Sequence, residues 1–129
     1  MDKALRYMTL ARKAGRLAVG ETGCGAAFAS GKARLLLLAS DASESTRKRA
    51  EKMLYGRRAP LRTLPWSRAE LSELLGKNSC VMMCFTDLPL ASKFASSMSE
   101  LLGDWSDTAE LLSQREAKAV RRKAAPRKH

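Results

Sequence analysis

Two apolar runs, each about as long as one β-strand, constrain the fold of this chain more than any other feature. They are LLLLA at residues 35–39 and VMMCF at residues 81–85. A strand that is apolar at every position has no face for solvent, so both faces of its sheet must be covered. The sequence therefore predicts a sheet that lies between two layers of helices.

Segments with helical periodicity alternate with segments of strand length along most of the chain. Leu5, Met8 and Ala11 recur at helical spacing, and the sequence Ser-Arg-Ala-Glu at 67–70 is that of a capping box at a helix start. Strands are expected at 16–19, 35–39, 61–64 and 81–85, and helices at 3–14, 21–30, within 40–56, at 67–75 and at 90–102. This alternation predicts an α/β fold, a three-layer α/β/α sandwich with a central four-stranded sheet, whose strand order the sequence leaves open.

The alternation ends near Gly103. Residues 1–102 are predicted to form one α/β domain, and residues 103–129 a basic C-terminal extension that is helical in part, around Ala109 to Val120. Trp105 is expected to dock this extension, whereas Tyr55 lies on an apolar helix face and is expected in the core. Both parts of the chain are basic, so the extension is not needed to explain the charge of the domain.

The charge of the chain points to the kind of partner. Lys and Arg number 24 against 13 Asp and Glu, a formal net charge of +11, which favours a polyanion over a small neutral ligand. No apolar run approaches the roughly 20 residues that cross a bilayer. The beginning of the sequence also lacks the apolar core of a signal peptide. We therefore expect a cytoplasmic protein with no membrane partner and no small-molecule substrate.

Metal and acid–base chemistry find no support in the sequence. Cys24, Cys80 and Cys84 lack the paired spacing of zinc sites and are expected to be reduced, buried thiols. The only histidine is His129, so a histidine-based catalytic pair within the domain is excluded. The carboxylates that stand at expected helix starts are interpreted as caps: Asp41, Glu44 and Asp87. We expect no enzymatic activity, no cofactor and no bound metal.

The segment GRLAVGETGCGAAFASGKA, residues 15–33, places glycines where a strand should end and a helix begin. A Walker phosphate loop would need Lys and a hydroxyl residue after Gly25, and a GxGxxG fingerprint would need glycine at Phe28; neither is present. A strand-to-helix junction at Gly20 remains, where main-chain amides can meet phosphate oxygens. The residues alone leave open whether Gly20–Gly25 binds a ligand or forms an ordinary turn.

Three blocks stand in order along the chain: LARKAGRLAVGE, GKARLLLLASDASESTRKR and ELSELLGKNSCVMMCFTD. They resemble the bacterial YlxQ-type proteins, small relatives of the ribosomal proteins of the L-seven-Ae and L-thirty-e superfamily, over roughly residues 4–102. The resemblance implies an L-thirty-e-like fold that binds structured RNA, in many members a kink-turn, which is a sharply bent internal loop with sheared G·A pairs. In RNA-binding members a GxNExxK signature opens the second helix and works with the loop before the last strand.

The signature transfers to this chain only in part. Its Gly falls on Gly20 and its Asn on Thr22, whereas its Glu and Lys fall on Gly23 and Ala26. Glu21, one position early, can replace some of the missing acidity. These departures put specific kink-turn binding in doubt and leave RNA binding as the expectation. Gly20→Val is expected to weaken RNA binding while leaving the fold intact.

The loop before the last strand supplies the second half of the expected site. It offers Lys77 to a phosphate and Asn78 to a base edge, between Gly76 and Ser79. Basic residues close to the first loop in sequence are further candidates for phosphate contacts: Lys13, Arg16, Lys32 and Arg34. The candidate RNA-binding residues are thus Lys13, Arg16, Gly20, Glu21, Thr22, Gly23, Lys32, Arg34, Gly76, Lys77, Asn78 and Ser79.

The sequence thus favours a non-catalytic, ribosome-associated protein that recognises structured RNA by its shape and its phosphates, with ribosomal or translation proteins as further partners. One alternative is a protein-interaction adaptor that keeps the fold without specific RNA binding. Another is an accessory subunit of an RNA-modifying enzyme. Salt dependence separates the first two, because phosphate contacts weaken steeply with salt and an apolar interface does not.

Overall fold

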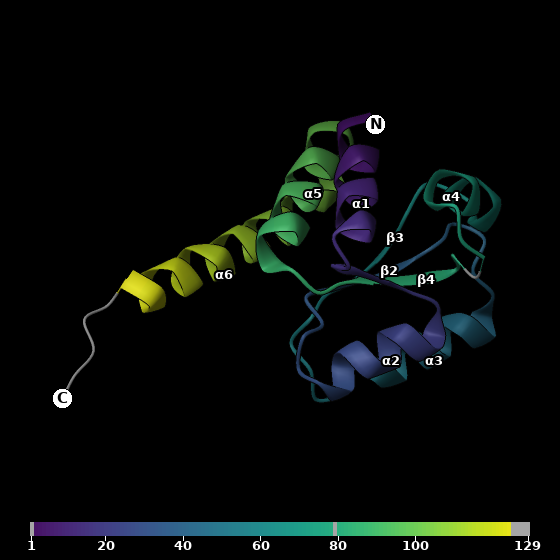
Figure 1. The fold of residues 1–129 in the computed structure, drawn as a ribbon, viewed down its shortest axis with the longest axis horizontal. Helices are drawn as coiled ribbons and strands as arrows, with labels where there is room; N and C mark the ends of the chain where they lie inside the picture. The colour runs from purple at the N-terminus through teal and green to yellow at the C-terminus, as the bar shows by residue number, and fades with distance from the viewer. Residues whose placement is uncertain (1, 79, 125–129) are drawn as a thin grey trace.

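The computed structural model describes residues 2–78 and 80–124 and shows helices and strands in alternation (Figure 1). The elements are α1 (Asp2–Lys13), β1 (Leu17–Val19), α2 (Glu21–Ala29), β2 (Leu35–Leu38), α3 (Glu44–Leu54), β3 (Leu61–Thr63), α4 (Arg68–Leu75), β4 (Met82–Phe85), α5 (Leu88–Leu101), the short 3₁₀ helix η1 (Gly103–Trp105) and α6 (Ser106–Ala124). Each predicted strand and helix is present, with ends that differ by a few residues.

The four strands form one mixed sheet in the order β1-β4-β2-β3. β4 is antiparallel to both β1 and β2, and β3 is parallel to β2. β1, β2 and β3 therefore run in one direction and end at the same edge of the sheet, where β4 begins. Sequence reasoning left this order open because it depends on contacts between segments far apart in the chain.

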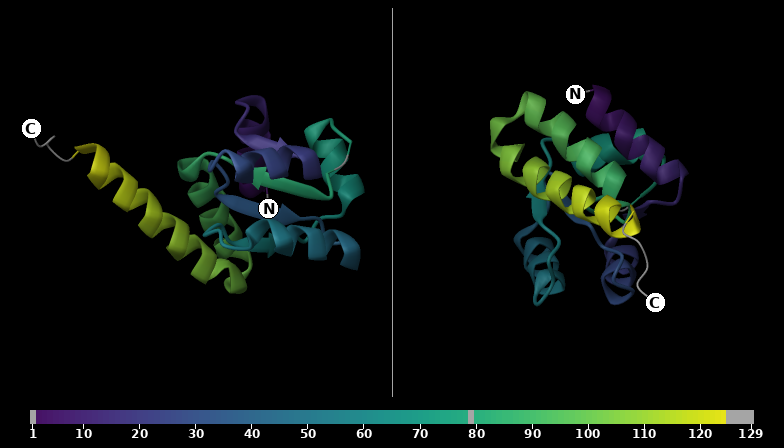
Figure 2. Two further views of the ribbon diagram at one scale, coloured as in Figure 1. Left: turned by 90° about the horizontal axis from the view of Figure 1, so that it is seen from below. Right: turned by 90° about the vertical axis from the view of Figure 1, so that its left-hand side faces the viewer.

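The central strands are buried on both faces, as their apolar runs predicted. Leu35 and Leu37 of β2 belong to the hydrophobic core on one side of the sheet, and Leu36 and Leu38 to the core on the other. This two-residue alternation is the pleat of a strand covered on both sides. The helices α1, α4 and α5 lie over the first face, and α2 and α3 over the second (Figures 1 and 2). The predicted α/β/α sandwich is confirmed.

The segment after Gly103 continues the first layer. Trp105 is 1% exposed and meets Phe94 of α5 edge-on, with ring centroids 5.8 Å apart. Ala109 and Leu112 of α6 belong to the same core, so the first turns of α6 pack on the domain. The second half of α6 extends away from the sheet (Figures 1 and 2). Trp105 thus docks the extension, as expected.

Helix capping follows the sequence in part. The capping box of α4 is present, because Ser67 Oγ accepts from the Glu70 N–H and the Glu70 carboxylate accepts from the Ser67 N–H. Asp87 caps α5 through the Leu90 N–H. The prediction that Asp41 and Glu44 are caps of α3 is wrong, because Ser43 is the N-cap and Glu44 stands in the first turn. The Asp41 carboxylate instead accepts from the first N–H of α4, at Arg68, 2.9 Å away.

One aromatic prediction is wrong. Tyr55 was expected in the core, but its side chain is 91% exposed at the C-terminal end of α3. The apolar face of α3 ends at Met53 and Leu54, and Gly56 turns the chain directly after Tyr55. The three cysteines, in contrast, are buried free thiols, as expected.

Candidate nucleic-acid interface

The sheet has two opposite edges, and the candidate residues are divided between them. We call the edge where β1, β2 and β3 end the Gly20 edge; it holds Gly20–Gly23 and Gly76–Asn78. The edge where these strands begin is the Arg34 edge. The Gly20 edge lies at the right of Figure 1 and the Arg34 edge at the left.

Gly20 is fixed in a conformation that only glycine adopts readily. Its φ of 91° and ψ of 162° lie in a region closed to side chains, and its N–H donates to the Met82 carbonyl at 2.8 Å. Gly20 is itself buried. Gly20→Val would therefore strain this backbone and lower the stability of the fold whether or not RNA binds there.

The first turn of α2 remains open at its amides. Gly20 provides no side-chain cap, and within the described residues no hydrogen bond uses the main-chain N–H of Glu21, Thr22 or Gly23. Thr22 is exposed, while a Cβ at Gly23 would meet the Ala18 Cβ at 3.6 Å, an ordinary contact. Amides at a helix start attract anionic oxygens. Thr22 and these amides can thus face a phosphate.

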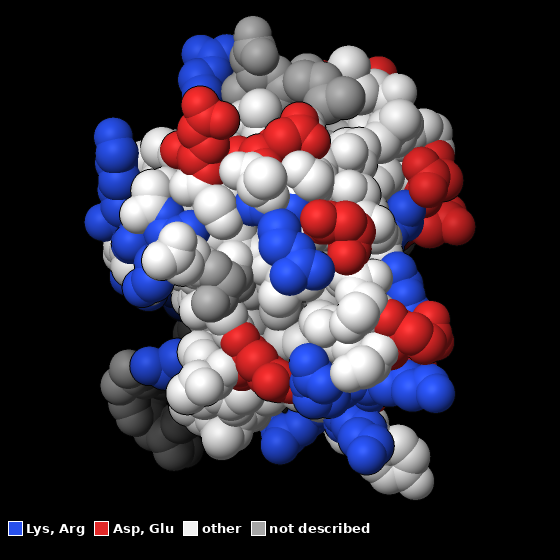
Figure 3. Space-filling view, turned by 90° about the vertical axis from the view of Figure 1, so that its right-hand side faces the viewer, with Lys and Arg blue, Asp and Glu red and all other residues white. Residues whose placement is uncertain are grey.

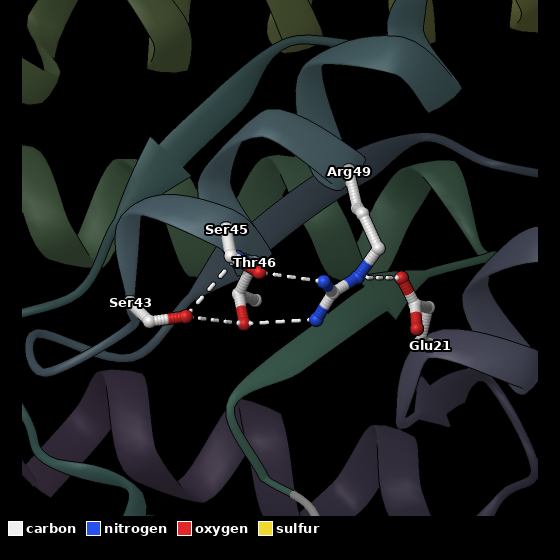
Figure 4. A network of polar contacts seen from close by, with 5 residues as sticks. All are labelled: Glu21, Ser43, Ser45, Thr46 and Arg49. Atoms are coloured by element: carbon white, nitrogen blue, oxygen red, sulfur yellow. Dashed lines mark hydrogen bonds and ion pairs between the residues drawn. The ribbon is translucent and has the colours of Figure 1, made fainter.

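The Glu21 carboxylate is held by the neighbouring helix. Arg49 of α3 pairs with it and also donates to Ser45 Oγ at 2.8 Å (Figure 4). Arg49 further donates to Thr46 Oγ1, which accepts from the capping hydroxyl of Ser43 at 3.0 Å. Glu21 therefore joins the starts of α2 and α3, and its charge is balanced by Arg49 within the protein.

The second predicted loop lies beside the first. Gly76 ends α4 in the left-handed conformation, at φ 62° and ψ 33°, and Lys77 and Asn78 are exposed. This loop leads into Met82, whose carbonyl binds the Gly20 N–H, so the two loops emerge at the same edge as the resemblance implied. Ser79 lies outside the described residues.

The Gly20 edge is mixed in charge. Figure 3 shows acidic and basic side chains interspersed over much of this face, with basic side chains gathered along its lower part. Acidic residues stand in the first turns of α2, α3 and α4, namely Glu21, Glu44 and Glu70. The hydrogen bond from the Arg68 N–H is the largest influence that lowers the pKa of Asp41, which keeps this carboxyl ionised.

The basic residues that are close to the first loop in sequence do not lie beside it in the structure. Lys13 ends α1, Arg16 precedes β1, and Lys32 and Arg34 precede β2, so all four lie at the Arg34 edge. Arg16 is adjacent in sequence to the strand that leads to Gly20, but that strand carries the chain across the sheet. Arg16 and Gly20 are four residues apart along this strand, at about 3.3 Å for each residue, so they lie at opposite edges.

Other basic residues at the Arg34 edge were not identified from the sequence. They are Arg57 and Arg58 before β3 and Arg115, Lys118 and Arg122 of α6. The spacing of the three residues of α6, at i, i+3 and i+7, indicates from the sequence alone that they share one helix face. Their proximity to Arg34 depends on how α6 packs, which the spacing does not give.

Within residues 2–78 and 80–124, no three or more His, Cys, Asp or Glu side chains are grouped so that they could hold a metal ion. In the same part of the chain, no helix combines the length and apolar character needed to cross a membrane.

Comparison with known proteins confirms the fold. No protein-family model matches the chain, and no curated protein matches it. The structure is similar to a solved structure described as a protein with unknown function from Bacillus halodurans, with a TM-score of 0.66 and 27% sequence identity. The match covers 74% of this chain and 96% of the other.

Proposed function

We propose that this protein is a non-catalytic cytoplasmic protein that binds structured RNA, in association with the ribosome, through its Gly20 edge. In this proposal the amides of the first turn of α2 and the Lys77 ammonium contact phosphates. Asn78 and Thr22 contact bases or sugars. RNA of this kind is recognised mainly by its shape and its unpaired bases.

The observation that carries the proposal is the joining of two loops distant in sequence. The hydrogen bond from Gly20 N–H to Met82 O holds the uncapped start of α2 beside the loop with exposed Lys77 and Asn78. Donors for phosphate and a side-chain amide for a base edge are thereby presented together. The net charge of +11 and the resemblance to YlxQ-type proteins support RNA as the partner.

A second candidate function is a protein-interaction adaptor. The mixed charge of the Gly20 edge favours it, because carboxylates such as Glu44 and Glu70 repel phosphates (Figure 3). Such an adaptor would bind a protein surface of mixed charge through the same loops. The dependence of binding on salt distinguishes the two functions.

The test is to identify RNA crosslinked to the full chain in cells and then to measure its affinity in vitro between about 50 and 200 mM salt. For RNA binding we expect a log–log slope of about −0.7 to −0.9 for each phosphate contact. Recovery of ribosomal RNA would support ribosome association. Absence of RNA both in the crosslinked sample and in dilute buffer would reject the proposal and leave the adaptor.

A further inference from the structure

A groove of about 500 Å³ opens at the Arg34 edge, on the side of the sheet away from Gly20. Four parts of the chain form it: the end of α2 with residues 31–34, the segment 56–59 before β3, Leu88 at the start of α5, and one face of α6. In Figure 1 the loops that line it are at the left of the sheet, on the same side as the projecting half of α6. Distant segments therefore come together here only in the folded protein.

The charged side chains that line this groove are all basic. They are Arg34, Arg57, Arg58, Arg115, Lys118 and Arg122. The nearest acid of α6 in sequence, Glu116, is turned about 100° around the helix from Arg115 and does not line the groove. The charged side chains of the groove are thus all positive, in contrast to those of the Gly20 edge.

The protein does not neutralise these cations with its described carboxylates. The ion pairs found among the described residues are Lys3–Glu100, Arg49–Glu21, Arg62–Asp104 and Arg68–Asp41. None of them includes a residue of the groove. Burial is the main cause that lowers the pKa of Arg115, and the nearby Arg58 and Arg34 lower it further, because like charges at this separation repel one another. A bound anion would relieve that repulsion.

The extent of the charge fits a chain of phosphates better than a single anion. From Arg115 to Arg122, α6 rises about 10 Å, at about 1.5 Å per residue, and further cations face it from the segment 56–59. One phosphate cannot contact all of these groups at once. A sugar–phosphate chain that runs along the groove can.

An exposed aromatic ring one residue away from the lining of the groove favours nucleic acid over an acidic peptide. Tyr55 is 91% exposed and lies beside Lys48, Glu51 and Lys52 of α3, and the next residue, Gly56, lines the groove. A ring in this position provides a stacking platform for a base next to a basic channel, the combination by which proteins bind single-stranded segments. An acidic peptide would use the cations and gain little from the ring.

We propose that this groove is a second RNA-binding surface, in which the basic face of α6 and the Arg34 edge hold a sugar–phosphate chain and Tyr55 stacks on a base. This inference rests on the proposed function, because it takes RNA as the polyanion. It adds a binding surface that lies across the sheet from Gly20 and Lys77. One RNA, or two segments of it, would then contact both edges of the domain.

The test compares two double variants of the full chain on the same helix. Arg115→Gln with Lys118→Gln removes two charges from the groove, while Arg121→Gln with Lys123→Gln removes two exposed charges that do not line it. The probe is a labelled RNA hairpin with an asymmetric internal loop and a single-stranded tail. Far-UV circular dichroism and the midpoint of urea unfolding check that both variants remain folded.

For the groove variant we expect about tenfold weaker binding near 0.1 M salt and a log–log salt slope reduced by about 1.4 to 1.8, two phosphate contacts. The control variant should stay within about twofold of the wild type. In the wild-type protein, RNA should protect Lys118 from amine acetylation more than Lys123, which tests the site without any substitution. Tyr55→Ala should weaken binding to the tailed hairpin while leaving the slope unchanged.

The outcomes separate the two proposals. Equal losses in both double variants, or equal protection of both lysines, would overturn the groove and leave the proposed function standing. Polyglutamate bound by the groove in place of RNA would also overturn it, in favour of an acidic protein partner. If the wild-type chain binds no RNA even at about 50 mM salt, the proposed function itself fails.

Discussion

The Arg62 guanidinium lies over the Trp105 ring, 4.5 Å from its centroid. Arg62 belongs to β3, the outermost strand of the sheet, and Trp105 belongs to η1 at the start of the C-terminal segment. The same guanidinium donates to the Asp104 carbonyl at 2.8 Å and to Thr108 Oγ1 at 3.0 Å, and pairs with the Asp104 carboxylate. One side chain therefore fixes the start of α6 to the sheet.

Replacing Arg62 should loosen this attachment. Arg62→Met keeps an apolar stem and removes the cation and the hydrogen bonds, so we expect the free energy of unfolding to fall by about 1–3 kcal/mol. Urea unfolding measures this loss, and hydrogen exchange should increase in the first turns of α6. Arg6→Met, at an exposed position of α1, is the control and should change little. Equal stability of the two variants would contradict the assigned role of Arg62.

Replacement of two glycines of the same segment by alanine should change the stability of the protein in opposite directions. Gly20→Ala forces a side chain into φ 91° and should destabilise the protein by about 1–3 kcal/mol. A Cβ at Gly25, inside α2, meets nothing within 4 Å. Gly25→Ala should therefore stabilise the protein by about 0.5–1 kcal/mol. Thermal unfolding of the two variants checks the prediction, and a similar shift in both would refute it.

The buried thiols predict a loss of stability in alkaline solution. Burial raises the pKa of Cys84 from 9.0 to about 11, and burial is also the main cause that raises the pKa of Cys24. The folded protein then keeps these protons after the unfolded chain has lost them. The stabilisation is complete below about pH 9 and declines as pH rises toward 11. Urea unfolding from pH 8 to pH 10.5 should show this decline.

Cys84→Ala provides the matching control for that decline. It removes one of the two titrating thiols, so the free energy of unfolding should fall less steeply with pH than in the wild type. The absolute stability of the variant is not the measure, because the substitution also leaves a small cavity. Parallel pH curves for the two proteins would show that Cys84 does not contribute.

Lys77 and Asn78 should affect RNA binding in different ways. Lys77→Ala should weaken binding to all RNAs and reduce the salt slope by about 0.7–0.9, because it removes one phosphate contact. Asn78→Ala should reduce discrimination between RNAs and leave the slope unchanged. Filter binding with two hairpins that differ only in the internal loop measures both effects. Lys93→Ala, at an exposed position of α5, is the control.

The sequence predicted the layers of the fold because the pattern that defines them is local. The all-apolar runs of β2 and β4 require cover on both faces, and Ser67 with Glu70 encodes its cap within four residues. The strand order and the reach of Asp41 to a different helix are long-range contacts, which no local pattern contains.

The candidate site was predicted less completely than the fold. The resemblance placed Gly20 and Lys77 in neighbouring loops, and the structure brings those loops together. Arg16 and Arg34 were assigned to the same place through closeness in sequence, although β1 and β2 carry the chain from one edge to the other. The place of Arg115 in the groove could not be predicted from the sequence, because it depends on the docking of Trp105 far from the groove.

The buried first turns of α6 determine in which direction the side chains of its later turns point. Leu112 is held in the core, and Arg115 follows three residues later on an uninterrupted helix. One alanine inserted between them would turn the distal cations by about 100°, whereas seven would return them to nearly their original bearing, about 10 Å farther out. The direction in which this helix presents its charge is thus set by hydrophobic packing several residues upstream.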